Sequence, residues 1–524
     1  MGNRFVGDQA MDSQCLDDRS ERNLSERNLS EPNLSQHKPS VSTRPSWNYF
    51  ESTWLRFLWM VPVFWVLTSC SSMKQTNVER GTQYRFQEGY PELRIAAIGL
   101  LDDSDQAYIN ITSEIVYGSL IYKEMDDVQV ALIRYEIRAN QVDGTESFGF
   151  QKELQIDTDL KIPFLNQDVM TLRNDLEVVP GTFDISISVT DLISGKTTIR
   201  ETNTIIPDPE NPEVNLTSIR LATNKQFQPG IDSGYTPVTT YAVGSTVDSL
   251  KFDFQVTNNN LAEPLRVESR LLSFKADSTA ANPLHFNNYS PSSIQYLGLE
   301  YRNADILYET TRVLQDPGSV TMEFYFPLPD RGNYRFEVNV LGSGDNESTY
   351  RARDFAVKSK NYPNIQSARE MAAPLIYLMD KKDHSKLMAE TDPATLKSKV
   401  DRFWLTSIGE QNTAKAVLSL YYDRVEKANK LFGNYKEGWK TDMGMMYILF
   451  GPPWYIERRL DGMWWSYSYD RNDPEYNFYF ERTKINTAYY PFDNFMLRRD
   501  VGYFNRQYQQ VQLWLTGGIL QRNL

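Results

Sequence analysis

Alternation of apolar and polar residues is the feature that most restricts how this chain can fold. Residues 183–189 read Phe-Asp-Ile-Ser-Ile-Ser-Val. Successive side chains of a β-strand point to opposite faces, so the apolar members of this run should share one buried face. Those members are Phe183, Ile185, Ile187 and Val189. Ser194-Gly195 then predicts a hairpin turn into a returning strand over residues 196–206. Short alternating strands of this kind predict an antiparallel sandwich.

A second segment repeats the same arrangement. Gly332-Asn333 precedes an alternating run that begins at Tyr334, as Gly181-Thr182 precedes the run that begins at Phe183. Between the two segments, residues 207–212 contain three prolines, which oppose a continuous strand or helix. We therefore expect two tandem immunoglobulin- or fibronectin-like β-sandwiches, over residues 91–207 and 213–358.

The remaining residues, 364–524, change to a helical pattern followed by aromatic strands. Asp392-Pro393 predicts a helix start, because Asp is a preferred N-cap and Pro suits the first helical position. Asp461-Gly462 predicts a tight hairpin turn. We expect strands over residues 444–450, 454–459, 463–469 and 476–482, and a final amphipathic helix over 499–514. Helices packed on an antiparallel sheet make this an α+β domain.

The most distinctive local pattern is Gly438-Trp439-Lys440-Thr441-Asp442. Gly438 suits a positive φ at a helix C-terminus, Trp439 supplies an apolar anchor, and Thr441 and Asp442 can accept hydrogen bonds from nearby backbone N–H groups. Two interpretations stay open: a helix-to-strand junction, which we favour, or a ligand site that uses Thr441 and Asp442. The rest of the pattern comprises Gly444, Tyr447, Gly451 and Pro452.

This stretch resembles the signature of the GWxTD-domain family, whose members are mostly Bacteroidetes lipoproteins. The resemblance covers about the last 160 residues. Met443 stands where the family usually has Arg, so a role of that arginine does not carry over. The family has no established activity. The resemblance therefore implies a domain and not a function.

The N-terminus predicts export and lipid attachment. Residues 1–48 are polar and repetitive, which predicts disorder or a translation start nearer Val41. Residues 49–69 carry a basic flank and a short apolar run, as a secretory signal does. The run ends in Leu-Thr-Ser-Cys70, which resembles a bacterial lipobox with Cys70 as the lipid attachment site. A transmembrane helix is one alternative, but the run is short and contains Pro62. A buried helix is another, but the run is isolated between two polar segments. Residues 70–90 would then be a tether.

The residues after Cys70 contain no acidic cluster of the kind found on surface-exposed Bacteroidetes lipoproteins. By that resemblance we expect an outer-membrane lipoprotein that faces the periplasm.

Composition excludes several classes of function. The formal net charge of −13 argues against a nucleic-acid binder, which needs a clustered basic face. Two cysteines and three histidines argue against a disulfide framework, a Cys-rich zinc site and most His-based catalysis. We expect no metal and no cofactor.

Aromatic residues alternate along the C-terminal strands. Trp465, Tyr467 and Tyr469 should share one face, either as core, which we favour, or as a surface for a glycan or protein. Glu457, with Asp442, Asp461 and Glu481 also near these strands, leaves a carboxylate-based glycosidase open.

These features predict a membrane-anchored envelope lipoprotein. We expect it to act as a binding or assembly component through its C-terminal domain, without catalysis and with an envelope protein as partner. The alternative is a periplasmic carbohydrate-binding or carbohydrate-cleaving protein that uses the aromatic strands and nearby carboxylates.

Overall fold

The computed structural model describes residues 78–79, 87–125, 128–158, 168–208, 210, 215–225, 234–258, 264–284, 289–341, 349–468, 475–485 and 492–522. The predicted extension, the signal segment, Cys70 and Tyr469 lie outside the described residues. None of the helices in these ranges has the length and apolar character that a membrane span requires.

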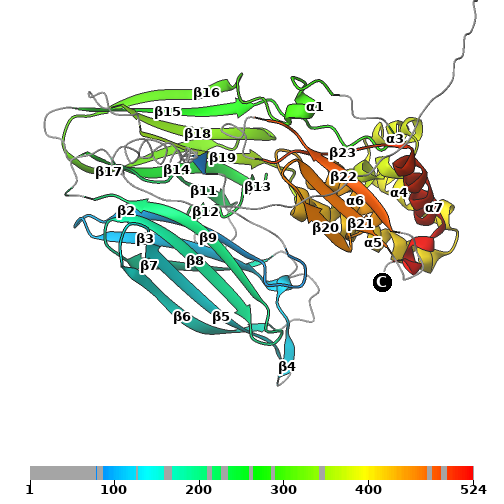
Figure 1. Ribbon diagram of the computed structural model, residues 1–524, viewed down its shortest axis with the longest axis horizontal. Helices are drawn as coiled ribbons and strands as arrows, with labels where there is room; N and C mark the ends of the chain where they lie inside the picture. Colours follow the sequence, from blue (N-terminus) through cyan, green and yellow to red (C-terminus); the bar gives the residue numbers. More distant parts are fainter. Residues whose placement is uncertain are drawn as a thin grey trace, which may run out of the picture. The chain divides into compact units, whose positions relative to one another are not determined.

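The first β-sandwich consists of two antiparallel sheets (Figure 1). One sheet contains β2 (Leu93–Leu101), β3 (Ala107–Val116) and β7 (Val169–Glu177). The other contains β4 (Lys123–Met125), β5 (Val128–Gln141), β6 (Ser147–Thr158), β8 (Gly181–Asp191) and β9 (Thr197–Ile206). A 3-10 turn, η1 (Tyr117–Ser119), follows β3. The four apolar residues of the predicted alternating strand are all buried on β8, which confirms their shared face.

The second β-sandwich has the same construction. Its first sheet contains β11 (Arg220–Lys225), β14 (Val247–Asn258) and β17 (Gly318–Pro327), with the short β10 (Asn215–Leu216) and β12 (Thr236–Pro237). Its second sheet contains β15 (Leu265–Phe274), β16 (Asp305–Leu314), β18 (Gly332–Leu341) and β19 (Thr349–Val357). The short strands β1 (Val78–Glu79) and β13 (Ala242–Val243) pair in parallel with β19. Phe336 lies at the centre of this core, stacked on Phe252 with ring centroids 4.5 Å apart.

Strand pairing shows that the two sandwiches share one topology. The order β2-β3-β7 corresponds to β11-β14-β17, and the order β6-β5-β8-β9 corresponds to β16-β15-β18-β19. The corresponding strands also follow one another in the same order along the chain. The sequence echo at Gly181 and Gly332 therefore marks the equivalent strands β8 and β18.

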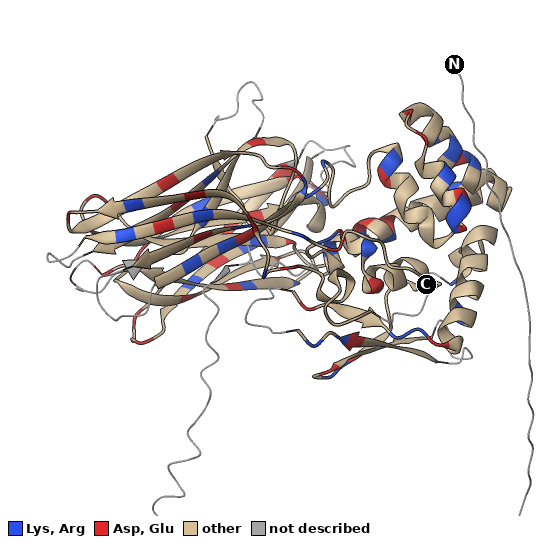
Figure 2. Ribbon diagram, turned by 90° about the horizontal axis from the view of Figure 1, so that it is seen from above, with Lys and Arg blue, Asp and Glu red and all other residues tan. Residues whose placement is uncertain are grey.

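Charged residues are interspersed along the strands of the sandwiches (Figure 2). Some form cross-strand ion pairs, such as Arg335 on β18 with Asp354 on β19, whose Nε and Oδ1 atoms lie 2.7 Å apart. Such pairs stabilise neighbouring strands and match the register that the buried face requires.

The second sandwich differs from the first in one insertion. A short turn joins β5 to β6, but residues 275–304 separate the equivalent strands β15 and β16. This insertion carries α1 (Ile294–Leu297) and contacts the C-terminal domain, where the backbone N–H of Ala281 donates to the carbonyl of Lys440 at 2.8 Å. The insertion therefore ties the sandwich to the domain that follows it.

The C-terminal domain is α+β, as predicted. Its helices are α2 (Ala368–Ala372), α3 (Lys381–Met388), α4 (Pro393–Ile408), α5 (Gln411–Phe432), α6 (Asp442–Phe450) and α7 (Val501–Thr516). Its 3-10 turns are η2 (Ala373–Tyr377), η3 (Gly438–Lys440) and η4 (Gly518–Gln521). One antiparallel sheet runs in the order β20 (Tyr455–Arg458), β21 (Gly462–Tyr467), β22 (Tyr476–Arg482) and β23 (Phe495–Leu497). The predicted N-cap is confirmed, because the Asp392 carboxylate accepts the N–H of Thr395.

The predicted strand over residues 444–450 is wrong, because these residues belong to helix α6. Every residue from Gly444 to Phe450 is buried. A helix that is buried on all sides is apolar on all sides, so its sequence lacks the 3.6-residue period that distinguishes a helix from a buried strand.

A buried charge cluster joins the second sandwich to the C-terminal domain. Glu437, at the start of η3, pairs with Arg331 from the sandwich and with Lys440 at 2.7 Å. Lys358, which follows β19, donates to the carbonyl of Asn434 at 2.6 Å. Burial lowers the pKa of Lys358 to about 7. Burial alone would raise the pKa of Glu437, but the charges of Lys440, Lys358 and Arg331 outweigh it and lower that pKa to about 2.

We predict that Glu437→Gln makes the free energy of unfolding less sensitive to pH in the acidic range. The folded-state pKa of Glu437 lies below its ordinary value of 4.5, so its ionised form stabilises the fold above about pH 4.5 and this contribution is lost as pH falls towards 2. The variant should lose up to about 3 kcal/mol at pH 7. The difference from wild type should shrink between pH 4.5 and 2 in urea unfolding. The exposed Glu309→Gln is the control, and a difference independent of pH would contradict this account.

Candidate functional site

The Gly-Trp-Lys-Thr-Asp stretch forms the entry to helix α6. Gly438, Trp439 and Lys440 make the 3-10 turn η3, and Thr441 is the N-cap of α6. The Thr441 hydroxyl oxygen accepts the N–H of Gly444 at 2.9 Å, and its hydroxyl donates to the carbonyl of Gly438 at 2.8 Å. This confirms that Thr441 accepts a hydrogen bond from a nearby backbone N–H group, although the element that it caps is a helix and not the predicted strand.

The two glycines of this entry are required by close backbone contacts. A Cβ on Gly438 would lie 2.0 Å from the carbonyl oxygen of Ala428 on α5. A Cβ on Gly444 would lie 1.9 Å from the carbonyl oxygen of Gly438. Gly438 does not have the positive φ that the sequence suggested. Its role is to let the turn lie directly against α5, so that prediction is corrected.

Asp442 makes contacts far from its own turn. One carboxylate oxygen accepts the N–H of Leu497 on β23 at 2.8 Å, and the other pairs with Arg499 at 2.6 Å. The Arg499 side chain is completely buried, and the Asp442 charge raises its pKa against the opposing effect of burial. A carboxylate in the first turn also interacts favourably with the helix dipole. Asp442 therefore ties the start of α6 to the segment between β23 and α7.

The other end of α6 is satisfied by side chains from α5 and α7. The carbonyl of Leu449 accepts from Gln510 Nε2 at 2.8 Å and from Trp514 Nε1 at 2.9 Å. Arg424 donates to the carbonyl of Ile448 at 3.2 Å. These bonds replace the water that a helix C-terminus would otherwise need. Gly451 ends the helix with a φ of 86°.

The motif tryptophan is an anchor in the core. Trp439 is 8% exposed, its ring meets Tyr377 edge-on, and its carbonyl accepts the Tyr377 hydroxyl at 2.7 Å. The backbone N–H of Trp439 donates to Oδ1 of Asn429 at 3.2 Å. Tyr447 of the motif is also buried and packs against Phe432.

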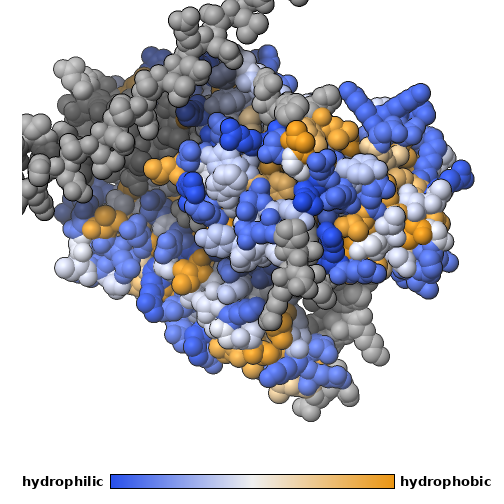
Figure 3. All heavy atoms as spheres, turned by 45° about the vertical axis from the view of Figure 1, so that its right-hand side comes forward, coloured by the Kyte–Doolittle hydropathy of each residue, from blue (hydrophilic) through white to orange (hydrophobic). Residues whose placement is uncertain are grey.

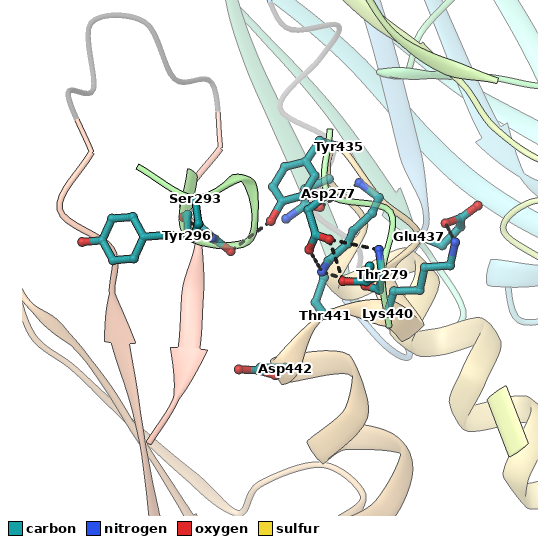
Figure 4. A network of polar contacts seen from close by, with 12 residues as sticks. Asp277, Thr279, Ser293, Tyr296, Tyr435, Glu437, Lys440, Thr441 and Asp442 are labelled. Carbon is teal, nitrogen blue, oxygen red and sulfur yellow. Dashed lines mark hydrogen bonds and ion pairs between the residues drawn. The ribbon is translucent and has the colours of Figure 1, made fainter. Parts of the chain in front are cut away.

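Polar contacts from the sandwich insertion cover the turn (Figure 4). Asp277 pairs with Lys436 at 2.7 Å and accepts the hydroxyl of Thr279 at 2.6 Å. Figure 4 shows Asp442 at the start of α6, apart from this group. The motif is thus enclosed by α5, β23 and the insertion, and its polar groups have partners within the chain.

The outer face of the β20–β23 sheet presents a different set of residues. Strand registers place Glu457, Trp464, Tyr479 and Arg498 in one row across the sheet. Trp464 and Tyr479 are half-buried, with ring centroids 4.8 Å apart and planes inclined by 41°. The Tyr479 hydroxyl donates to the carbonyl of Asp461 at 3.3 Å. A Cβ on Gly462 would lie 2.6 Å from that hydroxyl, so the tyrosine ring lies over the glycine.

This row borders a hollow of about 660 Å³. Its charged lining consists of Arg459, Asp461, Glu481, Arg482, Lys484 and Arg498. Arg459 pairs with Glu457 at 2.8 Å and Arg482 pairs with Asp493 at 2.5 Å. Within the described ranges, Arg498 and Lys484 form no ion pair. The hollow therefore combines an aromatic floor with two available cations.

Comparison with known sequences identifies the C-terminal region. The family model described as GWxTD domain matches residues 341–516. The region carries a GWxTD domain. The match begins in the last strands of the second sandwich and covers the motif, the outer face and the whole of α7.

Other comparisons add nothing on activity. A search of curated proteins finds no match. Among solved structures, red sea bream transglutaminase is 11% identical with a TM-score of 0.17, and the alignment covers 52% of this chain and 32% of that one. A Salmonella alpha-2-macroglobulin mutant is 15% identical with a TM-score of 0.17, covering 52% of this chain and 17% of that one. Similarity this low carries no argument.

Trp465 and Tyr467, which were predicted to share one face, both lie on the inner face of the GWxTD-domain sheet. Trp465 is 2% exposed and Tyr467 is 1% exposed, so both lie in the core and neither is accessible to a ligand. The core interpretation, which we favoured, is thus confirmed for Trp465 and Tyr467, and the alternative of a ligand surface is wrong for both. Of the other two residues of that proposed surface, Tyr469 lies outside the described residues and Glu457 lies at the end of the outer row.

Sequence reasoning missed Arg499 and the outer aromatic pair. Trp464 and Tyr479 each stand next to a core aromatic residue along their strands. Because neighbouring residues of a strand point to opposite faces, this alternation could have indicated that the two lie on the outer face. Arg499 had no comparable signal, because its partner Asp442 lies 57 residues away. In the described part of the chain, no three His, Cys, Asp or Glu side chains are grouped as a metal site would require.

We predict that Gly444→Ala destabilises the GWxTD domain. Alanine normally favours a helix over glycine by about 1 kcal/mol, but here its Cβ would meet the Gly438 carbonyl. The expected loss is about 1–3 kcal/mol, as for other overpacked sites. Gly502→Ala is the matched control, because Gly502 is an exposed glycine on α7 where a Cβ would approach only the Asp500 side chain, at 3.2 Å, so its replacement should have a much smaller effect. Equal effects of the two replacements in chemical denaturation would show that the Gly444 contact can relax.

Proposed function

We propose that this protein is a non-catalytic binding component of the bacterial cell envelope. It is attached to the outer membrane by lipid at Cys70, faces the periplasm, and holds its ligand or partner on the outer face of the GWxTD-domain sheet. Under this proposal the two β-sandwiches space that face from the membrane.

One contrast carries the proposal. The residues of the Gly-Trp-x-Thr-Asp motif are used in internal contacts, whereas the outer face keeps an accessible aromatic pair, Trp464 and Tyr479, beside Arg498 and Lys484. Aromatic residues and arginine are the side chains most often responsible for binding energy at interfaces. On the face of the molecule that Figure 3 shows, hydrophilic residues divide the hydrophobic surface into separate patches.

The ion pairs of the carboxylates near the sheet favour binding over glycoside cleavage. Glycosidases need two carboxylates placed on either side of the scissile bond. Asp442 is held by the buried Arg499, and Glu457 is paired with Arg459. The carboxylates left at the hollow, Asp461 and Glu481, suit the acceptance of hydrogen bonds from a ligand.

Lipid attachment is tested by Cys70→Ser. Removing the thiol removes the acylation site, and a protein without its acyl chains loses stable membrane binding. The variant should move from the membrane fraction to the soluble fraction of the cell, measured by fractionation and immunoblotting. Ser71→Ala is the control and should leave the distribution unchanged. Retention of the Cys70→Ser variant on membranes would contradict the anchor.

The binding surface is tested by affinity purification from gently solubilised envelopes. Trp464→Ala should abolish recovery of a component that wild type retains, because it removes half of the accessible aromatic pair. Trp454→Ala is the matched control, since Trp454 is 60% exposed in the same domain but does not line the hollow. Mass spectrometry and glycan analysis of the eluates give the readout. Equal recovery by all three proteins would refute the outer face as the binding surface.

A further inference from the structure

We propose that the hollow on the outer face of the GWxTD-domain sheet binds an acidic saccharide, with a sugar ring stacked on Trp464 and Tyr479 and its carboxylate paired with Arg498 and Lys484. This inference rests on the proposed binding function and adds the chemical class of the ligand.

The aromatic pair forms a fixed platform. The Tyr479 ring is held over Gly462, and its hydroxyl is tied to the carbonyl of Asp461 at 3.3 Å. A glycine on a strand leaves room for an aromatic side chain from the neighbouring strand to lie across it. The ring is therefore held in place before a ligand arrives, which lowers the entropy lost on binding. Trp464 extends the platform by one strand.

The geometry of the platform suits a saccharide. The hollow is open and lies on a sheet face, and the two rings are inclined by 41° to one another rather than parallel. Each ring presents an apolar face of its own, on which the apolar face of a sugar ring can stack. Asp461 and Glu481 beside it can accept hydrogen bonds from sugar hydroxyl groups.

The cations at the hollow point to an acidic ligand. The chain has a formal net charge of −13, so its overall field opposes the approach of an anion. Arg498 is the first residue after β23. It lies directly opposite Tyr479 on β22, and its backbone N–H donates to the Tyr479 carbonyl at 2.8 Å. Arginine matches a carboxylate with two parallel N–H donors. The strand positions of Trp464 and Arg498 are two strand spacings apart, which corresponds to about 10 Å between their backbones. One ligand can therefore contact both side chains.

The two carboxylates at the hollow favour a singly charged unit over a nucleotide. Several phosphate charges beside Asp461 and Glu481 would be repelled, whereas a sugar that carries one carboxylate and several hydroxyl groups can use the cations and the carboxylates together. A nucleotide that bound more tightly than the saccharide would therefore overturn the proposal.

The test is isothermal titration calorimetry on the detergent-solubilised full-length protein. The probes are a trisaccharide that contains one hexuronic acid, the neutral trisaccharide of the same linkage, and ATP. Wild type should bind the acidic trisaccharide most tightly. Trp464→Ala should weaken that binding at least about tenfold, or 1.4 kcal/mol, and Tyr479→Phe should weaken it less, because it keeps the ring but loses the hydroxyl that holds the ring in place.

Arg498→Gln separates the charge contribution from stacking. It should weaken binding of the acidic trisaccharide at least about tenfold and leave the weaker binding of the neutral one unchanged. Arg402→Gln, at an exposed arginine on α4, and Trp454→Ala are controls that should bind as wild type does. Circular dichroism and thermal unfolding of each variant verify that the fold is intact.

The outcomes distinguish this inference from the function on which it rests. Equal affinity for the acidic and neutral trisaccharides, or no effect of Arg498→Gln, would refute the acidic preference. If wild type binds neither trisaccharide but Trp464→Ala still abolishes capture of an envelope component, the saccharide assignment is wrong and the binding function stands. If both experiments are insensitive to Trp464→Ala, the outer face has neither role.

Discussion

The burial of helix α6 from Gly444 to Phe450 is the constraint on which the GWxTD domain depends. A buried helix end has no water to satisfy its free N–H and C=O groups, so the protein must supply partners for them. Thr441 does this at the start of α6, and Gln510, Trp514 and Arg424 do it at the end. The partners at the end of the helix come from α5 and α7, so the packing of these helices around α6 follows from the need to pair its carbonyl groups.

The same constraint gives the motif its physical meaning. Gly438 and Gly444 allow backbones to approach more closely than any side chain would permit, and Trp439 fills the space beside them. Asp442 joins two parts of the domain through a buried ion pair with Arg499, where removing either partner would leave an uncompensated charge. A sequence signature can therefore be distinctive because the architecture requires it, without any of its residues meeting a ligand.

The second sandwich is a structural partner of the GWxTD domain as well as a copy of the first sandwich. The two sandwiches share strand order, but only the second has the insertion between β15 and β16 that covers the motif turn. Lys358 and Arg331 from the sandwich meet Glu437 at the same junction. The sheet of the GWxTD domain then has two distinct faces, an inner one built on Trp465 and an outer one built on Trp464, and the binding proposal belongs to the outer face.

The sequence alone determined the elements whose pattern has a clear period or a local signal. The alternation from Phe183 to Val189, the cap at Asp392 and the glycine-led strands at Gly181 and Gly332 all depend on neighbours along the chain, and the two sandwiches and the α+β domain were predicted from them. Tertiary structure decided the rest. Helix α6 has no period because it is buried on all sides, Arg499 meets Asp442 only after the chain has folded back, and the choice between Trp464 and Trp465 as the exposed residue depends on which face the helices cover.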